Sequence, residues 1–298
     1  MAKTISPRMR QRIIIAEFAL PAVIILAVLV FFPIIKTIIM SFQEWQLTSP
    51  SADHPFLGLE NYSDVVTLSH FSQMITTTLI YTFFSVAGKM IVGLLVALLF
   101  NRPFKGRAIA RGLMLIPWAM PTVVACNVFL ISLDPNYGIL TSFIEAVFRV
   151  TGLDVFSSTT SSLVAVILIA IWKNFPFISL MLLAALSGIP QDYYDAASID
   201  GANAFVKFRS VTWPQIKPIW NTLLVLQFLW TVKEFELIYL ITRGGPNNAT
   251  NVMGIDIYLN AFRYYHVGVA SAEGVILLLI CVIFSIVYFR GLNKEEEA

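Results

Sequence analysis

Residues 195–214 read DAASIDGANAFVKFRSVTWP, a polar stretch between two long apolar segments. Carboxylates precede and open this stretch, and basic residues fill its second half. Pro190 suits the first position of a helix, because that position needs no backbone N–H. Acidic residues just after it would face the positive end of the helix dipole. We predict a helix that starts at Pro190, a sharp turn at Gly201, and a second short helix from about Asn203 that Trp213-Pro214 interrupts.

The composition is that of a membrane protein. The 298 residues are 57% hydrophobic and 13% charged, with a net charge of +2 and a mean hydropathy of +0.77. These values exclude an ordinary soluble domain and a disordered chain, and the charge gives no case for a nucleic-acid partner. A helix needs about 20 apolar residues to cross a bilayer, and without water in the core each span should be helical. The sequence therefore predicts an all-α membrane protein with six transmembrane helices, near residues 18–42, 73–100, 108–133, 161–187, 218–241 and 268–289.

Lys and Arg occur mainly in alternate connections between the spans, and this asymmetry predicts orientation. They cluster before the first span, between the second and third, between the fourth and fifth, and after the last. The connection at 43–70 has four acidic residues and no Lys or Arg. We expect both termini and the 195–214 stretch in the cytoplasm. The predicted organisation is a cytoplasmic tail at 1–12, a six-helix membrane domain at 13–290 with a cytoplasmic loop at 188–217, and a cytoplasmic tail at 291–298.

The spacing inside the polar stretch resembles a loop of a known family. The pattern is Asp-Ala-Ala, three residues, Gly, nine residues and Val-x-Trp-Pro, at Asp195, Ala196, Ala197, Gly201, Val211 and Pro214. It resembles the E-A-A-x3-G-x9-I-x-L-P loop of permease subunits in bacterial ABC importers, with Asp in place of Glu, Val in place of Ile and Trp in place of Leu. In that family the loop forms a coupling helix that docks in a groove of the ATPase subunit.

Three other segments extend the resemblance over nearly the whole chain. Residues 56–62, FLGLENY, are similar to the F-x-G-L-x-N-Y segment that follows the first helix of sugar permeases. Residues 115–121, LIPWAMP, resemble the L-I-P-x-x-x-P stretch of their third helix, and residues 242–246, TRGGP, resemble their outer G-G-P segment. By the order and membrane side of these segments, the chain is identified as a member of the maltose-type carbohydrate ABC permeases.

The resemblance implies an ABC importer type I permease fold in the bacterial inner membrane, with a cytoplasmic coupling helix. It implies four kinds of partner: a second homologous permease, two ATPase subunits that bind ATP and Mg, an extracytoplasmic solute-binding protein, and the lipid bilayer. The implied activity is import of a mono- or oligosaccharide by alternating access, with no enzymatic reaction in this chain.

The sequence contains no nucleotide-binding motif of its own. A phosphate-binding loop needs Gly, four residues and Gly-Lys-Ser/Thr. The sequence Gly88-Lys89 is followed by Met90, so ATP must be bound by a partner. Cys126 and Cys281 each lie in an apolar run and suit buried packing, not a disulfide or a metal site. We predict no cofactor or metal in this chain, and we expect its three histidines, His54, His70 and His266, to be solvated loop residues.

Polar side chains inside the fourth and fifth spans predict a translocation path, because charge is costly to bury in lipid. The candidate path residues, which would hydrogen-bond hydroxyl groups and stack a sugar ring, are Trp172, Lys173, Asn174, Phe175, Trp230, Lys233, Glu234 and Glu236. Pro176 would kink the fourth span and expose backbone to a cavity. Lys233 and Glu236 are spaced to pair on one helix face, whereas Lys89 stands alone in the second span.

Other interpretations remain open for the same residues. The aromatic side chains would equally serve helix packing, and Lys233 with Glu234 or Glu236 would equally form an ion pair that holds helices together. Import of glycerol-3-phosphate would need a basic cavity, which Lys89, Lys173 and Lys233 allow and the two glutamates oppose.

Two further classes of protein are weighed against the importer. An ion-driven secondary transporter would show internal repeats and broken helices, and neither is evident in the sequence. A membrane-embedded enzyme would need a catalytic group at one depth, for which Lys173, Glu234 and Glu236 are the only candidates.

Overall fold

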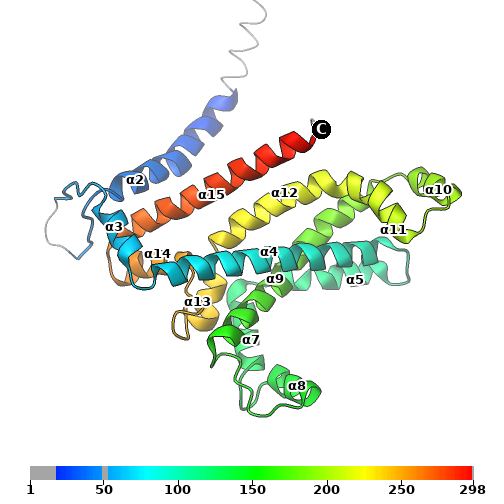
Figure 1. The fold of residues 1–298 in the computed structure, drawn as a ribbon, viewed down its shortest axis with the longest axis horizontal. Helices are drawn as coiled ribbons and strands as arrows, with labels where there is room; N and C mark the ends of the chain where they lie inside the picture. Colours follow the sequence, from blue (N-terminus) through cyan, green and yellow to red (C-terminus); the bar gives the residue numbers. More distant parts are fainter. Residues whose placement is uncertain (1–17, 49–52, 297–298) are drawn as a thin grey trace, which may run out of the picture. The chain divides into compact units, whose positions relative to one another are not determined.

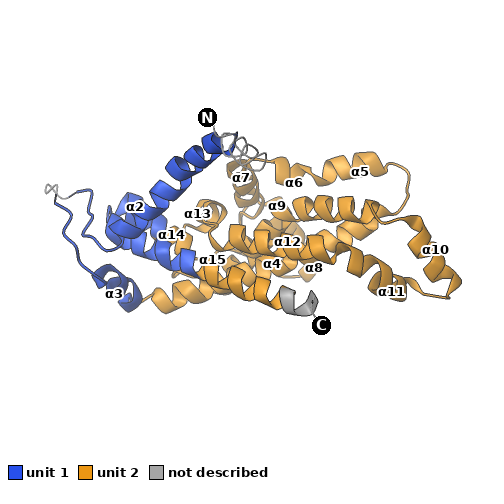
Figure 2. Ribbon diagram, turned by 90° about the horizontal axis from the view of Figure 1, so that it is seen from above, with its two compact units in different colours: residues 1–68, 257–279 blue, residues 69–256, 280–298 orange. Residues whose placement is uncertain are grey.

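The computed structural model describes residues 18–48 and 53–296, so the tail predicted at 1–12 lies outside the described residues. The described chain is almost entirely helical (Figure 1), with isolated β-bridges that join Gln43 to Phe56 and Gln46 to His266. It divides into two compact units (Figure 2). They are Met1–Leu68 with Ile257–Leu279, and Ser69–Asp256 with Ile280–Ala298.

The first unit contains the first span and the connection that follows it. A helical run over Phe18–Met40 includes the π-helical turn η1 (Ala27–Phe31) and α2 (Phe32–Met40). The connection leads to α3 (Glu60–Thr67). From the C-terminal part of the chain, the unit holds η3 (Leu259–Arg263) and the first residues of α15 (Val267–Glu296).

The FLGLENY segment at 56–62 fixes α3 against the end of the first span. Gly58 has a φ of +60°, a backbone conformation that favours glycine. The Asn61 side chain is buried, and its Nδ2 donates a hydrogen bond to the Ser41 carbonyl at 2.9 Å. Tyr62 Oη lies 2.7 Å from Ser41 Oγ. Asn61 and Tyr62 therefore each have a structural role at the C-terminal end of α2.

The second unit holds the remaining helices, and α10 and α11 lie together at one of its ends (Figure 1). The bounds are α4 (Phe71–Asn101), α5 (Arg107–Met114), α6 (Ile116–Ala119), α7 (Thr122–Ser132), α8 (Ile139–Phe148), α9 (Thr159–Ser187), α10 (Gln191–Ile199), α11 (Ala204–Lys207), the π-helical turn η2 (Phe208–Thr212), α12 (Trp213–Val232), α13 (Glu236–Thr242) and, at its boundary, α14 (Met253–Tyr258).

Four of the described helices are long and apolar enough to cross a membrane: Phe18–Met40, Phe71–Asn101, Thr159–Ser187 and Val267–Leu292. They confirm the spans predicted near 18–42, 73–100, 161–187 and 268–289. Pro176 does not break α9, which runs through it. The third and fifth predicted spans are different, because each is interrupted.

The third predicted span is broken at Met120-Pro121. The pieces Arg107–Ala119 and Thr122–Ser132 are bent by 93°, and they count as a fifth span only if taken together. Proline has no N–H and forces the residue before it out of the helical region, so Met120 is extended with ψ of 132°. The buried ammonium group of Lys173 in α9 donates a hydrogen bond to the Met120 carbonyl at 2.9 Å. The prediction of one continuous helix over 108–133 was wrong.

The fifth predicted span, at 218–241, is also divided into two helices. α12 has 20 residues and ends at Val232, and α13 begins at Glu236. Lys233 and Glu236 therefore lie at the ends of different helices, and no ion pair joins them among the described residues. Glu234, in the break, is instead paired with Lys89 of α4, at 3.8 Å between Nζ and Oε2. The predicted Lys233–Glu236 pair and the isolated Lys89 were both wrong.

The polar stretch departs from prediction at its C-terminal end. Trp213-Pro214 does not interrupt the second helix, because α11 continues through η2 into α12. Pro214 stands in the first turn of α12, where a missing N–H is tolerated. The wider π-helical turn before it changes the hydrogen-bond register and accommodates the proline ring.

α4 and α9 pack closely against each other in the second unit. A Cβ added to Gly93 would lie 2.6 Å from Ile178 Cγ2, and one added to Gly88 would lie 2.2 Å from Ile171 Cδ1. Ser179 Oγ also donates a hydrogen bond to the Gly93 carbonyl at 2.9 Å. Small residues allow membrane helices to approach closely. The buried core that includes this contact contains Val86, Met90, Ala97, Ile178, Leu182, Leu183, Leu186, Ile216 and Leu223.

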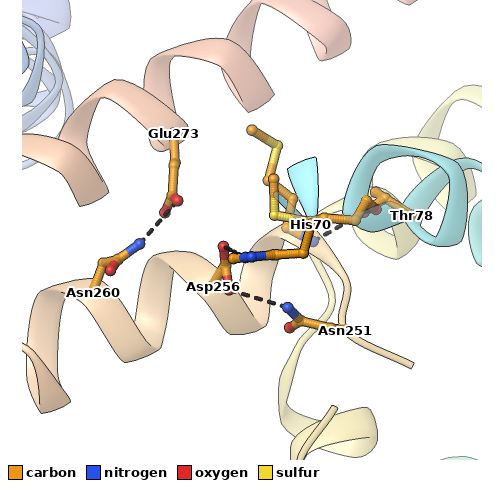
Figure 3. A network of polar contacts seen from close by, with 8 residues as sticks. His70, Thr78, Asn251, Asp256, Asn260 and Glu273 are labelled. Carbon is orange, nitrogen blue, oxygen red and sulfur yellow. Dashed lines mark hydrogen bonds and ion pairs between the residues drawn. The ribbon is translucent and has the colours of Figure 1, made fainter. Parts of the chain in front are cut away.

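A polar network joins the beginning of α4 to the segment around α14 (Figure 3). His70 Nε2 lies 2.9 Å from Asp256 Oδ2, and Asn251 Nδ2 donates to Asp256 Oδ1 at 3.1 Å. The Met253 N–H donates to Thr78 Oγ1 at 2.9 Å. The prediction that His70 is a solvated loop residue was wrong, because its partner is a buried carboxylate 186 residues away in the sequence.

Lys173→Met is expected to destabilise the protein. The substitution keeps most of the length of the side chain but removes the donor of the Met120 carbonyl, and an unsatisfied buried acceptor costs about 1–3 kcal/mol. For a protein of this size we expect the thermal midpoint in detergent to fall by roughly 2–10 °C.

Lys105→Met is the matched control, since Lys105 is exposed in the connection between α4 and α5. We expect its midpoint to equal that of the unsubstituted protein. Equal midpoints for both variants would contradict a role for Lys173 in holding the break.

Candidate functional site

The 195–214 stretch forms a helical turn at one end of the second unit (Figure 1). α10 ends in a turn in which Gly201 has a φ of +77°. The Ala202 N–H donates to the Ala197 carbonyl at 2.9 Å, the hydrogen bond that closes a helix when glycine follows its last residues. Asn203 then caps α11 through its side chain, which accepts from the N–H of Val206 at 3.0 Å. The predicted turn at Gly201 is therefore present.

Side-chain hydrogen bonds connect α10 to the helical segment that follows it. Tyr194 Oη lies 3.1 Å from Oγ1 of Thr212, a buried residue directly before α12. Lys207 Nζ donates to Ser198 Oγ at 2.7 Å. Because both bonds reach across the turn, α10 is tied to the start of α12 as well as to α9.

The residues predicted for ATPase coupling fall on three parts of this turn. Asp195, Ala196 and Ala197 lie in α10, Gly201 lies in the turn, Val211 lies in η2 and Pro214 lies in α12. Asp195 is exposed, and it accepts a hydrogen bond from Gln191 Nε2 at 3.1 Å.

Large apolar side chains are exposed on the same turn, and sequence reasoning missed them. Ile199 is 87% exposed and Phe205 is 70% exposed, with Tyr193 at 53%. Apolar side chains gathered on an otherwise polar turn are typical of a surface that another protein covers. The signal was present in the sequence as apolar residues at the tips of two short predicted helices.

A polar cavity of about 370 Å³ lies where α12 breaks before α13. It is lined by Lys89, Asn174, Gln227, Trp230, Lys233, Glu234, Phe235 and Glu236. Five of the predicted path residues are therefore brought together, from α9, α12, the break and α13. Amide, carboxylate and indole groups in one cavity can hydrogen-bond hydroxyl groups and stack a flat apolar face of a ligand.

Glu234 is held in place by side chains from α4. Tyr81 Oη donates to Glu234 Oε2 at 3.1 Å, and Lys89 Nζ lies 3.8 Å from the same oxygen. Lys89 is 1% exposed and also donates to Thr231 Oγ1 at 3.0 Å. Sequence reasoning missed the contacts of Tyr81 and Lys89 with Glu234, because nothing in a single sequence indicates that residues so far apart are in contact.

The other predicted path residues do not line this cavity. Trp172 packs edge-to-face against Phe129, with ring centroids 5.0 Å apart. Lys173 is directed to the Met120 carbonyl at the break of the third span. Phe175 is half-buried in α9 and is not among the lining residues.

Two larger cavities, of about 880 and 590 Å³, are lined mainly by apolar side chains of α4 with α9 and of α4 with α12. They offer few polar groups to a hydroxylated ligand. Among the described residues, no group of three or more His, Cys, Asp or Glu side chains is arranged to hold a metal ion.

The chain is similar to known permeases over most of its length. It is 34% identical to the trehalose/maltose transport system permease protein MalF of Thermococcus litoralis, over 91% of this chain and 90% of that one. It is 30% identical to the sulfoquinovosyl glycerol transport system permease protein SmoG of Agrobacterium fabrum, over 96% of this chain and 92% of that one.

The fold is similar to that of a chain in a crystal structure of a bacterial ABC transporter involved in the import of the acidic polysaccharide alginate. The TM-score is 0.82 with 20% sequence identity, over 96% of this chain and 97% of that one. The family model described as binding-protein-dependent transport system inner membrane component matches residues 89–290. This chain therefore belongs to the family of binding-protein-dependent transport system inner membrane components, the multi-pass permease subunits of ABC importers.

Proposed function

We propose that this chain is the permease subunit of an ATP-driven importer that moves a sugar into the cytoplasm. The observation that carries the proposal is the 34% identity to a trehalose/maltose permease over 91% of the chain. The polar cavity at the end of α12 supports it, because amide and indole groups suit a hydroxylated ring. The substrate is a mono- or oligosaccharide delivered by an extracytoplasmic solute-binding protein.

The proposed assembly contains a second homologous permease and two ATPase subunits, which bind ATP and Mg. A cytoplasmic position of both termini and of α10 is supported by the Lys and Arg asymmetry of the connections. The same orientation puts the α12–α13 break on the extracytoplasmic half of the membrane. A ligand released by the binding protein would reach the cavity from that side.

In this proposal α10 is the coupling helix, and the exposed side chains of Ile199 and Phe205 are covered by the ATPase groove. ATP closes the ATPase dimer and moves α10. The hydrogen bond between Tyr194 and Thr212 transmits this movement to α12, and the peptide after α9 transmits it to α9. Both helices line the cavity, so alternating access follows from rigid-body movement of helices that the loop connects.

The alternative of an ion-driven secondary transporter is less well supported. Broken helices, which that class often uses, are present at Met120-Pro121 and at residues 233–235. The fold that contains these breaks is similar to that of a chain in an ABC transporter structure over 96% of this chain. Ion coupling also gives no reason for an apolar surface on α10 and α11.

Reconstituted with its permease partner, ATPases and binding protein, the chain is expected to support ATP-dependent uptake. The measurement is accumulation of labelled maltose or trehalose in proteoliposomes with ATP on the ATPase side. We expect uptake with ATP and none with a non-hydrolysable analogue or with an imposed ion gradient in place of ATP. Uptake that follows an ion gradient without ATP would overturn the proposal.

Gly201→Ala is expected to weaken coupling more than it weakens assembly. An alanine at a φ of +77° is strained by roughly 1–2 kcal/mol. If that strain is released by distortion of the docking turn, uptake falls by roughly 5- to 30-fold. The checks are the uptake rate and the number of sugars imported per ATP hydrolysed.

Gly106→Ala is the matched control for this substitution. Gly106 has a φ of +83° and open space at its Cβ position, as Gly201 has, but it lies before α5 and outside the turn. Its expected uptake and coupling ratio are those of the unsubstituted protein. Equal losses in both variants would show that backbone strain alone, and not the docking turn, limits transport.

A further inference from the structure

The charged side chains around the polar cavity are balanced. Lys89 and Lys233 contribute two positive charges, and Glu234 and Glu236 contribute two negative charges, so the formal sum over the cavity is zero. The four charged residues are placed differently. Lys89 and Glu234 interact inside the cavity, whereas Lys233 and Glu236 are exposed at the ends of α12 and α13.

The ammonium group of Lys89 is not available to an anionic ligand. It is almost completely buried, it donates to Thr231 Oγ1 at 3.0 Å, and it lies 3.8 Å from Glu234 Oε2. Glu234 Oε2 also accepts from Tyr81 at 3.1 Å. The Lys89 charge therefore compensates the Glu234 charge. Of the two lysines that line the cavity, this leaves only the exposed Lys233 to bind a ligand carboxylate or phosphate.

Neutral hydrogen-bonding groups also line the same cavity. Gln227 is 2% exposed and lines the cavity. Asn174 also lines the cavity, and its amide donates to the Ala170 carbonyl at 3.0 Å. A side-chain amide can both donate and accept hydrogen bonds, so these two residues are suited to the hydroxyl groups of a ligand.

We infer that the Lys89–Glu234 pair makes this cavity selective for a neutral polyhydroxylated ligand over an anionic one. The inference rests on the proposed import of a sugar and adds the charge class of that sugar. Lys89 cancels the Glu234 charge, and Tyr81 fixes the carboxylate so that Oε1 accepts a ligand hydroxyl. Gln227 and Asn174 supply neutral donors and acceptors, and the exposed indole of Trp230 supplies a stacking face.

The test changes the cavity charge in both directions and then restores it. Glu234→Gln leaves Lys89 uncompensated, Lys89→Met leaves Glu234 uncompensated, and the double variant is again balanced. The probes are labelled maltose and the maltose analogue in which one primary alcohol is oxidised to a carboxylate. The measured quantity is the ratio of kcat/KM for uptake of the neutral probe to that of the acidic probe, in proteoliposomes with the complete complex.

The binding protein also discriminates between the probes, but the same binding protein serves every variant. Its contribution therefore cancels when the ratio of a variant is divided by the ratio of the unsubstituted complex. Each variant is compared at equal amounts of assembled complex, and Lys105→Met in the exposed connection before α5 is the control for loss of a lysine.

We expect the unsubstituted complex and Lys105→Met to favour the neutral probe. Glu234→Gln should lower the ratio by about tenfold or more, because two charges within about 8 Å in a partly buried site interact that strongly. Lys89→Met should raise the ratio further by disfavouring the acidic probe. The double variant should bring the ratio back toward that of the unsubstituted complex, even if its absolute uptake is lower.

Three results would overturn the inference. If uptake of both probes falls in parallel in all three variants, so that the ratio is unchanged, the Lys89–Glu234 pair only stabilises the fold. If the double variant keeps the ratio of Glu234→Gln, charge balance is not the cause. If the unsubstituted complex prefers the acidic probe, the cavity is not selective for neutral ligands, although sugar import stands. Failure of the complex to import any tested sugar with ATP would instead remove the proposed function on which the inference rests.

Discussion

Hydrogen bonding to backbone groups inside the bilayer is the constraint on which this structure depends. A spanning helix that stops midway leaves carbonyl and N–H groups without partners, and lipid cannot supply them. The third span stops at Pro121, and Lys173 of α9 supplies the donor for the Met120 carbonyl. The fifth span stops after Val232, and there the Glu234 N–H donates to the Thr231 carbonyl. Lys89 contacts the side chains of both Thr231 and Glu234.

The same constraint explains why α9 connects so many parts of the second unit. Lys173 donates a hydrogen bond to the Met120 carbonyl at the break of the third span, and Asn174 lines the polar cavity. Ser179 donates to the Gly93 carbonyl in the close contact with α4. α9 then ends at Ser187, a few residues before α10. α12 leaves the other side of the turn and carries Gln227 and Trp230 to the same cavity. The two helices that border the loop are therefore two of those that line the cavity, so a displacement of α10 has a direct structural route to the ligand site.

Much of this arrangement was predictable from the sequence, and the remainder depends on long-range partners. The length of the apolar segments was sufficient to predict the spans at Phe71–Asn101 and Thr159–Ser187. The conformational freedom of glycine was sufficient to predict the turn at Gly201. Whether a proline ends a helix was not predictable: Pro121 breaks one, whereas α9 runs through Pro176. The outcome depends on donors that other helices supply, and these lie far away in sequence. The pairing of Lys89 with Glu234, 145 positions apart, was hidden for the same reason.

The central claim is that α10 transmits ATP-driven movement of a partner subunit to the membrane helices. The most direct measurement is disulfide cross-linking of Ala197→Cys to a cysteine scanned along the groove of the co-expressed ATPase, after Cys126 and Cys281 are replaced. The account predicts a cross-link in assembled membranes whose yield changes when ATP is added. If assembled complexes give no cross-link from any position between Asp192 and Ala202, with or without ATP, α10 does not contact the ATPase and the account of coupling is contradicted.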